Sequence, residues 1–476
     1  MRSQFVPDDA ALRERYARHY YELAGILYRL ETRHPQPVRA PAHRELPNLR
    51  RALNILLEVG EPEVVTRMAN SIAMFLYIFG LPRERDELWK RVEKAMAAAD
   101  TKDGGALTTA KFWHECALGE DELNKGNLRA ACVRFTELLV RVEALPEGTP
   151  VGKGSFEHFY TLKELANYLR AGGRPSAAEQ QQREALVIIE TLIKRQPDDQ
   201  HLIRKLGELL TELGTALVDQ GRYMQTRGKY EKALEVARRQ GDLRQRGVVL
   251  GQLGTLAQLQ GDHAKARANF TAALEISCSL GERALDAVAW HQLGMLAQDQ
   301  REWVEAQRCY RESLIIVESL GDWAKAAATC NQLAIVSQST NHPVEAEGWY
   351  RRALELDELV DPGRQGSAGD LNNLAFLLLQ EVQAARAPRS RLAEARNYAE
   401  RALAIKEKVD ASIGEIWNTL GHLVSIAEVE GRTAEARNYR RRERETFAAF
   451  EGNRSRIDHW FGSFIADVVA AAKGNA

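Results

Sequence analysis

The sequence predicts an all-α fold, an α-α superhelix built from antiparallel helix hairpins. Three observations lead to this prediction: a Leu-Gly or Leu-Ala pair recurs every 40 residues, small and aromatic residues follow each pair at fixed offsets, and Gly residues separate the segments. One helix hairpin cannot bury its apolar face alone, so a period of this length indicates hairpins that stack into a continuous core. The 476 residues are 45% hydrophobic and 28% charged, which is the balance of a folded globular protein.

The first helix of each unit is predicted from the Leu-Gly or Leu-Ala pair. The pairs recur at 40-residue intervals, with a last step of 41, and begin at Leu213, Leu253, Leu293, Leu333 and Leu374. Seven residues after the small member of the first four pairs stand Gly221, Gly261, Arg301 and Asn341. Gly and Asn are typical of the position that ends a helix. The spacing therefore predicts a turn at each of these four positions.

The second helix of each unit is predicted from small and aromatic residues in a constant order. The aromatic positions are Tyr230, Phe270, Tyr310 and Tyr350, each with Ala or Thr four residues before it and Ala or Ser three residues after it. Gly241, Gly281 and Gly321 end these helices, and the acidic residue after each Gly favours the start of the next helix. Because Gly or Ala beside Leu lets two helices approach closely, we expect the aromatic side chain to fill the remaining gap.

This pattern resembles the tetratricopeptide repeat (TPR), in which Leu-Gly or Leu-Ala marks the first helix and Ala, an aromatic residue and Ala mark the second. The motif is clearest at Trp290, Leu293, Gly294, Ala306 and Tyr310. The unit has 40 residues, against about 34 in the family, and the extra residues fall in the linkers and the helix ends. The resemblance implies a TPR solenoid in which the first helix of each unit lines the concave face.

Degenerate copies extend the repeat in both directions. Leu118-Gly119 keeps the offsets of the regular units, and so does Leu165-Ala166, although Gln182 replaces the aromatic residue there. After the regular units, the second helix of the unit that begins at Leu374 has its aromatic residue, Tyr398, one position early. A last decayed unit follows around Leu423.

The regularity of the repeat divides the chain into four predicted segments. They are an N-terminal helical region (1–100), degenerate TPR-like repeats (101–200), a TPR array (201–445) and a C-terminal capping helix (446–476). The apolar positions of the last segment, from Trp460 to Val469, follow helical spacing. A repeat array needs a cap on its last apolar face, and an oligomerisation or partner-binding helix is the alternative interpretation.

The N-terminal region contains an apolar helix around Tyr20, a break predicted at Pro35, Pro37 and Pro41, and a helix over 45–53, followed by an aromatic-rich hairpin. This order resembles the sensor region of STAND-type (NB-ARC/NACHT-like) signalling ATPases. The resemblance implies an upstream nucleotide-binding switch domain that this chain does not contain. The nearest string to a phosphate-binding loop, 148–154, has the wrong Gly spacing and lacks the Ser or Thr that binds magnesium. We interpret it as a plain loop.

Composition and motifs exclude several classes of function. With 65 Lys and Arg against 66 Asp and Glu, the net charge of −1 favours neither nucleic acid nor a membrane surface as a partner. The longest apolar run, Ile72–Phe79, is far shorter than the roughly 18–20 residues of a membrane span. Five scattered cysteines suit a reducing compartment, and no secretion signal begins the sequence. We therefore expect a cytoplasmic protein.

No motif points to catalysis. The 11 histidines are scattered and none begins an H-E-x-x-H motif, and no nucleophile elbow or cysteine pair with metal-ligand spacing is present. The basic cluster from Arg437 to Arg444 is interrupted by Glu443, which is typical of a solvated helix face. The sequence thus predicts no catalytic residue, no metal site and no cofactor.

Polar side chains recur on the first helices at three offsets from the repeated Leu. From Leu253 onward, the position before this Leu is an amide: Gln252, Gln292, Gln332 and Asn373. One position earlier stand His291, Asn331 and Asn372, and five positions after the Leu stand Gln258, Gln298 and Gln338. Because an amide can donate to and accept from a peptide main chain, we predict that these residues bind a partner. The alternative is that they only bond adjacent units together.

The sequence therefore predicts a non-enzymatic scaffold that binds a protein or peptide on the concave face of a TPR superhelix. Recognition of a free C-terminus is not expected, since Gln and Asn occupy the positions where a carboxylate clamp needs Lys and Arg. The alternative function is the ligand or partner sensor region of a STAND-type signalling ATPase or transcription regulator.

Overall fold

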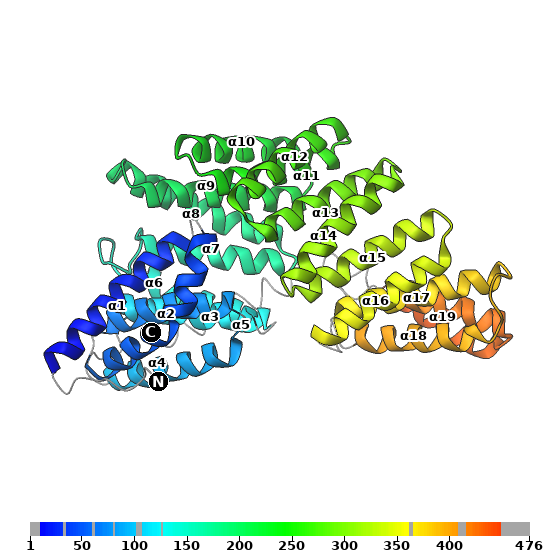
Figure 1. Ribbon diagram of the computed structural model, residues 1–476, viewed down its shortest axis with the longest axis horizontal. Helices are drawn as coiled ribbons and strands as arrows, with labels where there is room; N and C mark the ends of the chain where they lie inside the picture. Colours follow the sequence, from blue (N-terminus) through cyan, green and yellow to red (C-terminus); the bar gives the residue numbers. More distant parts are fainter. Residues whose placement is uncertain are drawn as a thin grey trace. The chain divides into compact units, whose positions relative to one another are not determined.

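The computed structural model describes residues 10–31, 35–59, 62–79, 81–100, 107–124, 127–360, 365–407 and 416–448. Every regular element in these ranges is an α-helix (Figure 1). The helices, labelled as in Figure 1, are Ala10–Glu31 (α1), Pro35–Val59 (α2), Pro62–Ile78 (α3), Pro82–Asp100 (α4), Thr109–Asn124 (α5), Leu128–Glu143 (α6), Phe156–Ala171 (α7), Pro175–Arg195 (α8), Gln200–Asp219 (α9), Tyr223–Arg239 (α10), Leu243–Leu259 (α11), His263–Leu280 (α12), Arg283–Asp299 (α13), Trp303–Ser319 (α14), Trp323–Ser339 (α15), Pro343–Val360 (α16), Gln365–Gln383 (α17), Arg391–Lys406 (α18) and Ile416–Glu430 (α19). Residues 433–448 are also helical.

Two compact units make up the described chain. The first holds the described residues up to Gln252 together with Ser279–Glu282, and the second holds Leu253–Cys278 and the described residues from Arg283 onward. This division follows contact density, whereas the four segments predicted from the sequence follow repeat regularity. Those segments remain a prediction, and the predicted capping helix over 446–476 lies almost entirely outside the described residues.

Consecutive helices pack as antiparallel hairpins within each unit. In the first unit the pairs are α1 with α2, α3 with α4, α5 with α6, α7 with α8 and α9 with α10. In the second unit α13 packs on α14, α15 on α16 and α17 on α18. Within each unit, successive hairpins also pack on one another, for example through α6 and α7 or α14 and α15. The predicted all-α stack of helix hairpins is confirmed.

Glycine in the Leu-Gly pair allows the two helices of a hairpin to approach closely. A Cβ atom built on Gly294 would lie 2.7 Å from the ring of Tyr310, which is closer than such atoms come in proteins. On Gly254 it would lie 2.6 Å from the ring of Phe270. The aromatic side chains are fully buried, so the ring occupies the space that a side chain would need. The packing role predicted for the pair and the aromatic position is confirmed.

The four predicted turn positions adopt the left-handed conformation that ends a helix. The φ angles are 71° at Gly221, 75° at Gly261, 58° at Arg301 and 60° at Asn341. Arg and Asn accept this conformation at some cost, which indicates that the hairpin geometry imposes it. The predicted turn positions are confirmed.

The break expected at Pro35, Pro37 and Pro41 coincides with the start of a helix at Pro35, but it is wrong at Pro37 and Pro41. Helix α2 begins at Pro35 and continues through Pro41 and Pro47. Pro35 and Pro37 fall in the first turn, where the backbone N–H groups have no acceptor within the helix. Pro41 removes one interior hydrogen bond, but its helical neighbour Ala42 is fully buried in the core, so packing offsets that loss.

Helix α18 forms as predicted, but Tyr398 does not fill the aromatic position. Ala399, at the regular offset, is fully buried, while Tyr398 is half-buried. A shift of one residue rotates a side chain by about 100° around the helix. The hydroxyl of Tyr398 therefore donates to Glu394 Oε1 (3.3 Å) and accepts from Arg351 Nη1 (3.1 Å) instead of packing against the first helix.

Candidate functional site

All ten residues predicted to bind a partner lie on odd-numbered helices and are half-buried. Gln252 belongs to the first unit, where the hydroxyl of Tyr230 donates to its Oε1 at 3.4 Å. The other nine belong to the second unit, on α11, α13, α15 and α17. Their hydrogen bonds separate them into three groups with different roles.

The glutamines five positions after the repeated Leu hold the stack together. Tyr310 donates from its hydroxyl to Gln298 Oε1 at 2.9 Å, and Tyr350 donates to Gln338 Oε1 at 3.3 Å. The amide nitrogen of Gln338 donates to Gln380 Oε1 on the next odd-numbered helix (2.7 Å). Gln258 likewise donates from Nε2 to Asp299 Oδ2 (2.6 Å). At Gln258, Gln298 and Gln338 these bonds support the structural interpretation.

The residues two positions before the repeated Leu bond to the next odd-numbered helix. His291 Nδ1 lies 3.4 Å from Thr329 Oγ1, and the side-chain amide of Asn331 donates to Asp370. Asn372 Oδ1 lies 3.1 Å from the ring nitrogen Nδ1 of His422. Burial lowers the pKa of His422 to about 4, so this imidazole is neutral at physiological pH. These bonds therefore link neighbouring repeats within the second unit.

In the second unit, the residues directly before the repeated Leu differ from both groups. Gln292, Gln332 and Asn373 are half-buried, and their side chains make no hydrogen bond to any other described residue. We call these three residues the amide row. A small cavity of about 200 Å³ lies beside Gln292, with His291, Lys325 and Thr329 in its wall. The amide row thus presents donors and acceptors that the second unit itself does not use.

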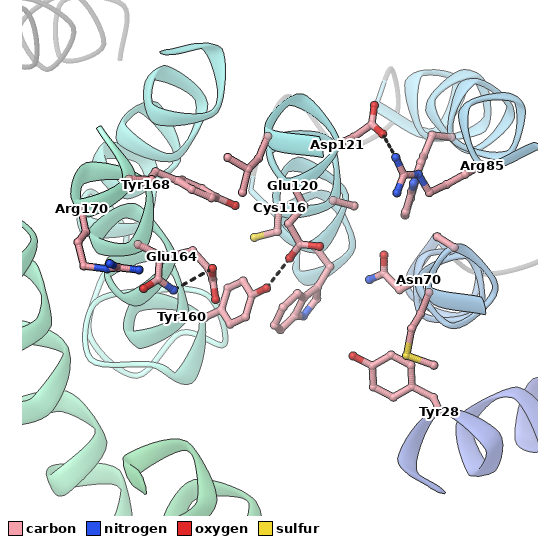
Figure 2. A pocket seen from close by; sticks show the side chains of 18 residues that line it. Tyr28, Asn70, Arg85, Cys116, Glu120, Asp121, Tyr160, Glu164, Tyr168 and Arg170 are labelled. Atoms are coloured by element: carbon pink, nitrogen blue, oxygen red, sulfur yellow. Dashed lines mark hydrogen bonds and ion pairs between the residues drawn. The ribbon is translucent and has the colours of Figure 1, made fainter. Parts of the chain in front are cut away.

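A larger cavity lies in the first unit and was not predicted from the sequence (Figure 2). It has a volume of about 660 Å³ and is lined by side chains from α1, α3, α4, α5 and α7. We call it the acidic hollow because Glu120, Asp121 and Glu164 stand in its wall beside several aromatic rings. Its volume falls within the range of about 300–1,000 Å³ that is usual for ligand pockets.

Hydrogen bonds orient the carboxylates of the acidic hollow. Tyr160 donates from its hydroxyl to Glu120 Oε1 at 2.7 Å (Figure 2). The side chain of Glu120 still reaches solvent, but partial desolvation by the surrounding wall, together with the charge of Glu164, raises its pKa. Lys163 places its Nζ 2.7 Å from Glu164 Oε1 and 3.1 Å from Glu212 Oε1. Burial lowers the pKa of Lys163, but the charges of Glu212 and Glu164 outweigh it and raise that pKa well above its usual range.

The sequence contained a signal for this cavity. The offsets used for the regular units, applied to the degenerate pair at Leu118, select Cys116, Ala117 and Leu123, and all three line the hollow. Applied to the pair at Leu165, they select Glu164 and Arg170 among the lining residues. The sequence-based search considered only the four regular units and the one after them, so these residues were missed.

Metal binding and membrane insertion find no support in the described residues. No group of three or more His, Cys, Asp or Glu side chains in that part of the chain could hold a metal ion. None of its helices is long and apolar enough to cross a membrane.

Comparison with known families identifies the repeat. The profile of the tetratricopeptide repeat matches residues 206–279 and 285–358, and a second profile of the tetratricopeptide repeat matches residues 160–201. These segments match the tetratricopeptide repeat. The second profile extends the match to a segment in which the repeat is degenerate. No curated protein matches the sequence.

Among the solved structures that are similar to this chain, one has a tetratricopeptide repeat sensor. The signal transduction ATPase with numerous domains (STAND) with a tetratricopeptide repeat sensor, from Pyrococcus horikoshii, is 15% identical and has a TM-score of 0.52; the match covers 78% of this chain and 50% of that protein. BtubC from P. vanneervenii is 21% identical and has a TM-score of 0.41; the match covers 49% of this chain and 92% of that one. The quorum sensor NprR from B. thuringiensis is 12% identical and has a TM-score of 0.47; the match covers 78% of this chain and 97% of that one. At these identities the similarity to the STAND sensor concerns the fold, and the matched part is half the length of that protein.

Proposed function

We propose that the protein is a non-enzymatic scaffold that binds a protein partner through an extended segment laid along the amide row. The observation that carries this proposal is the difference among the three groups of polar residues in the second unit. Two groups are occupied by bonds within the stack, whereas Gln292, Gln332 and Asn373 have no partner in the described chain. Repeats that needed amides only for stacking would have no use for this third group.

An extended main chain is the ligand that best matches the amide row. Each carboxamide offers two N–H donors and one oxygen acceptor, which is what the alternating C=O and N–H groups of a peptide require. Because the three side chains are half-exposed, water solvates them in the free protein, and binding replaces those hydrogen bonds without leaving a buried group unpaired. A highly charged ligand would find no opposite charge among the row residues.

The proposal is tested with two triple variants that differ only in which group of amides they remove. In the first variant Gln292, Gln332 and Asn373 are replaced by Ala, and in the second Gln258, Gln298 and Gln338 are replaced by Ala. A library of displayed 12-residue peptides is selected on the full wild-type chain, and the enriched peptides are titrated into each variant.

Opposite outcomes are expected from the two variants. The amide-row variant should lose at least tenfold in affinity and keep its melting temperature, since surface substitutions usually change stability by less than about 0.5 kcal/mol each. The other variant should melt at lower temperature, since each lost hydrogen bond contributes about 0.5–1.5 kcal/mol. Selection of no peptide at all, or full affinity in the amide-row variant, would contradict the proposed function.

A sensor region of a STAND-type signalling ATPase or a transcription regulator is the second candidate function. The fold similarity to the TPR sensor of the Pyrococcus horikoshii protein, over 78% of this chain, favours it. In that case the natural product would carry a nucleotide-binding switch domain in addition to these 476 residues. An antibody raised against the array would then detect a much longer polypeptide in source cells, and a band of the length expected for this chain alone would argue against the sensor. A cytoplasmic location belongs to both candidates, and fractionation of the same cells tests it.

A further inference from the structure

The acidic hollow has the size and the walls of a binding pocket. Its volume of about 660 Å³ exceeds what a single long side chain fills, and Glu120 is solvent-exposed at its surface, so the cavity is open to a ligand. Tyr28, Trp89, Trp113 and Tyr160 contribute aromatic rings from four different helices. The rings of Trp113 and Tyr160 meet edge to face with centroids 4.9 Å apart, which fixes the orientation of this part of the wall.

The charges of the hollow do not balance. Arg85 forms an ion pair with Asp121 (3.0 Å) and Arg170 forms one with Asp219 (3.4 Å), so both arginines in the wall are neutralised. Lys163 is shared by two carboxylates, those of Glu164 and Glu212.

Glu120 is the carboxylate that this arrangement leaves over. It accepts a hydrogen bond from Tyr160 but has no Lys, Arg or His within ion-pair distance among the described residues. Together with the second carboxylate on Lys163, it gives the hollow about two uncompensated negative charges.

A second, independent feature points to a ligand. The side chain of Tyr168 is only 2% exposed, and its hydroxyl has no hydrogen-bond partner in the described chain. Figure 2 shows this hydroxyl directed from α7 toward Cys116 and the interior of the hollow. A buried hydroxyl is almost always paired in a folded protein, so an unpaired one in the wall of a cavity indicates a missing polar partner.

The carboxylates and aromatic rings of the wall favour a positively charged ligand. An anion would be repelled by Glu120 and Glu164, and a neutral apolar group would leave their carboxylates desolvated without compensation. A cation would pair with Glu120 and lie against the aromatic faces, which attract cations through their π-electrons. A metal ion is a poor fit, since the described residues hold no cluster of three or more ligand side chains.

We propose that the acidic hollow binds a lysine or arginine side chain of a protein partner, with Glu120 as its counter-ion and the Tyr168 hydroxyl as an additional hydrogen-bond partner. The inference rests on the proposed function in that the occupant belongs to a bound peptide. It adds a second recognition site, in the first unit and separate from the amide row. A long, flexible, cationic side chain can reach into a cavity while its own main chain stays at the surface.

The test begins with the same library of displayed 12-residue peptides, selected on the full wild-type chain and on the Glu120→Gln variant. Glu120→Gln keeps the shape of the side chain and an acceptor for Tyr160 but removes the charge. We expect wild type to enrich peptides with Lys or Arg at one fixed position and the variant to lose this preference. Glu231→Gln is the control, because Glu231 is exposed on α10 of the same unit and does not line the hollow.

A thermodynamic cycle then locates the contact. The best selected peptide is synthesised with Lys at the enriched position and with norleucine, which keeps the aliphatic chain and lacks the ammonium group. Each change, Glu120→Gln in the protein and Lys to norleucine in the peptide, should weaken binding about tenfold or more. The two together should weaken it by little more than either alone, because both remove the same interaction. Tyr168→Phe should also weaken the Lys peptide while leaving the norleucine peptide unchanged.

The outcomes separate this inference from the proposed function. Selected peptides without a basic preference, or losses that simply add in the cycle, would overturn the inference and leave the scaffold function standing. Tight binding of free putrescine, together with a library that shows no basic preference, would assign the hollow to a small amine and also overturn it. Failure to select any peptide would contradict the scaffold function itself.

Discussion

The hydroxyl of Tyr310 donates a 2.9 Å hydrogen bond to Gln298 Oε1, which lies 12 residues earlier on the first helix of the same hairpin. Tyr350 and Gln338 show the same relationship in the next repeat, at 3.3 Å. The aromatic ring fills the gap beside the Leu-Gly or Leu-Ala pair, and its polar end is satisfied by the glutamine at the end of the first helix. In these two hairpins the glutamine is therefore part of the packing.

Replacing Tyr310 by Phe should lower the free energy of unfolding by about 0.5–1.5 kcal/mol, the usual net contribution of one hydrogen bond. The replacement of Gln298 by Ala should cost a similar amount. In a double-mutant cycle measured by urea unfolding, the combined variant should lose less than the sum. Fully additive losses would show that this hydrogen bond, which joins α13 and α14, does not contribute to stability.

Gly294→Leu should destabilise the second unit, because the added side chain would collide with the buried ring of Tyr310. Overpacking of this kind costs about 1–3 kcal/mol or more. Gly294→Ala is the smaller change and should cost less than Leu, because it adds only the Cβ that would lie 2.7 Å from the ring, and Ala334 is buried at the equivalent position of the next repeat. Thermal unfolding followed by circular dichroism measures both variants, and equal melting temperatures for Leu and Gly at position 294 would contradict the packing described for the pair.

Gln182→Met should stabilise the first unit. Gln182 takes the aromatic position of a degenerate repeat, is fully buried, and neither polar atom of its amide has a hydrogen-bond partner. Leaving buried polar atoms unpaired costs about 1–3 kcal/mol, and Met fills a similar volume without polar hydrogen-bonding groups of this kind. Gln180→Met, at an exposed position on the same helix α8, should change the melting temperature little. A lower melting temperature for Gln182→Met would mean that the amide has a partner after all.

The stability of the second unit should fall as the pH rises from about 4 to about 7, through the titration of Asp370. Burial raises the pKa of Asp370 to about 7, against an ordinary value of 3.8, and the hydrogen bond from Asn331 only partly opposes this rise. The folded chain therefore holds a proton in this range that the unfolded chain releases, so the stabilising contribution is complete below about pH 4 and lost above about pH 7.

Asp370→Asn keeps an acceptor for Asn331 and removes the ionisation. Chemical unfolding measured at intervals of pH should show that the variant has lost this component of the pH dependence and is more stable than wild type at pH 8. Parallel pH profiles for the two proteins would contradict the assignment to Asp370.

The regular repeats could be predicted from the sequence because their packing repeats with it. The aromatic position at Tyr310 and the turn at Arg301 recur at the same offsets in each regular repeat, and both occur in the structure as expected. The break at Pro41 was predicted from a local preference, and the burial of its neighbours in a tertiary core overrode that preference. Local sequence preferences predict the structure correctly where the same packing recurs in every repeat. They are less reliable at a position such as Pro41, whose packing occurs only once.

The roles of the polar side chains could be predicted only in part. The sequence showed that Gln292 and Gln298 recur on one helix, but not that Gln298 meets Tyr310 while Gln292 meets no other described residue, because that depends on the rotation of one helix against another. The acidic hollow depends on side chains from five helices, including Tyr28 and Glu120, whose separation in the sequence reveals nothing about their proximity. Offsets derived from the regular units would nevertheless have selected Glu164 and Cys116.

Calorimetric titration of a library-selected peptide into wild type and into the amide-row variant, with Ala at positions 292, 332 and 373, tests the central claim most directly. The account predicts at least a tenfold loss of affinity in the variant, which corresponds to about 1.4 kcal/mol, with melting temperatures that agree within about 2 °C. Equal affinities in two equally stable proteins would contradict it.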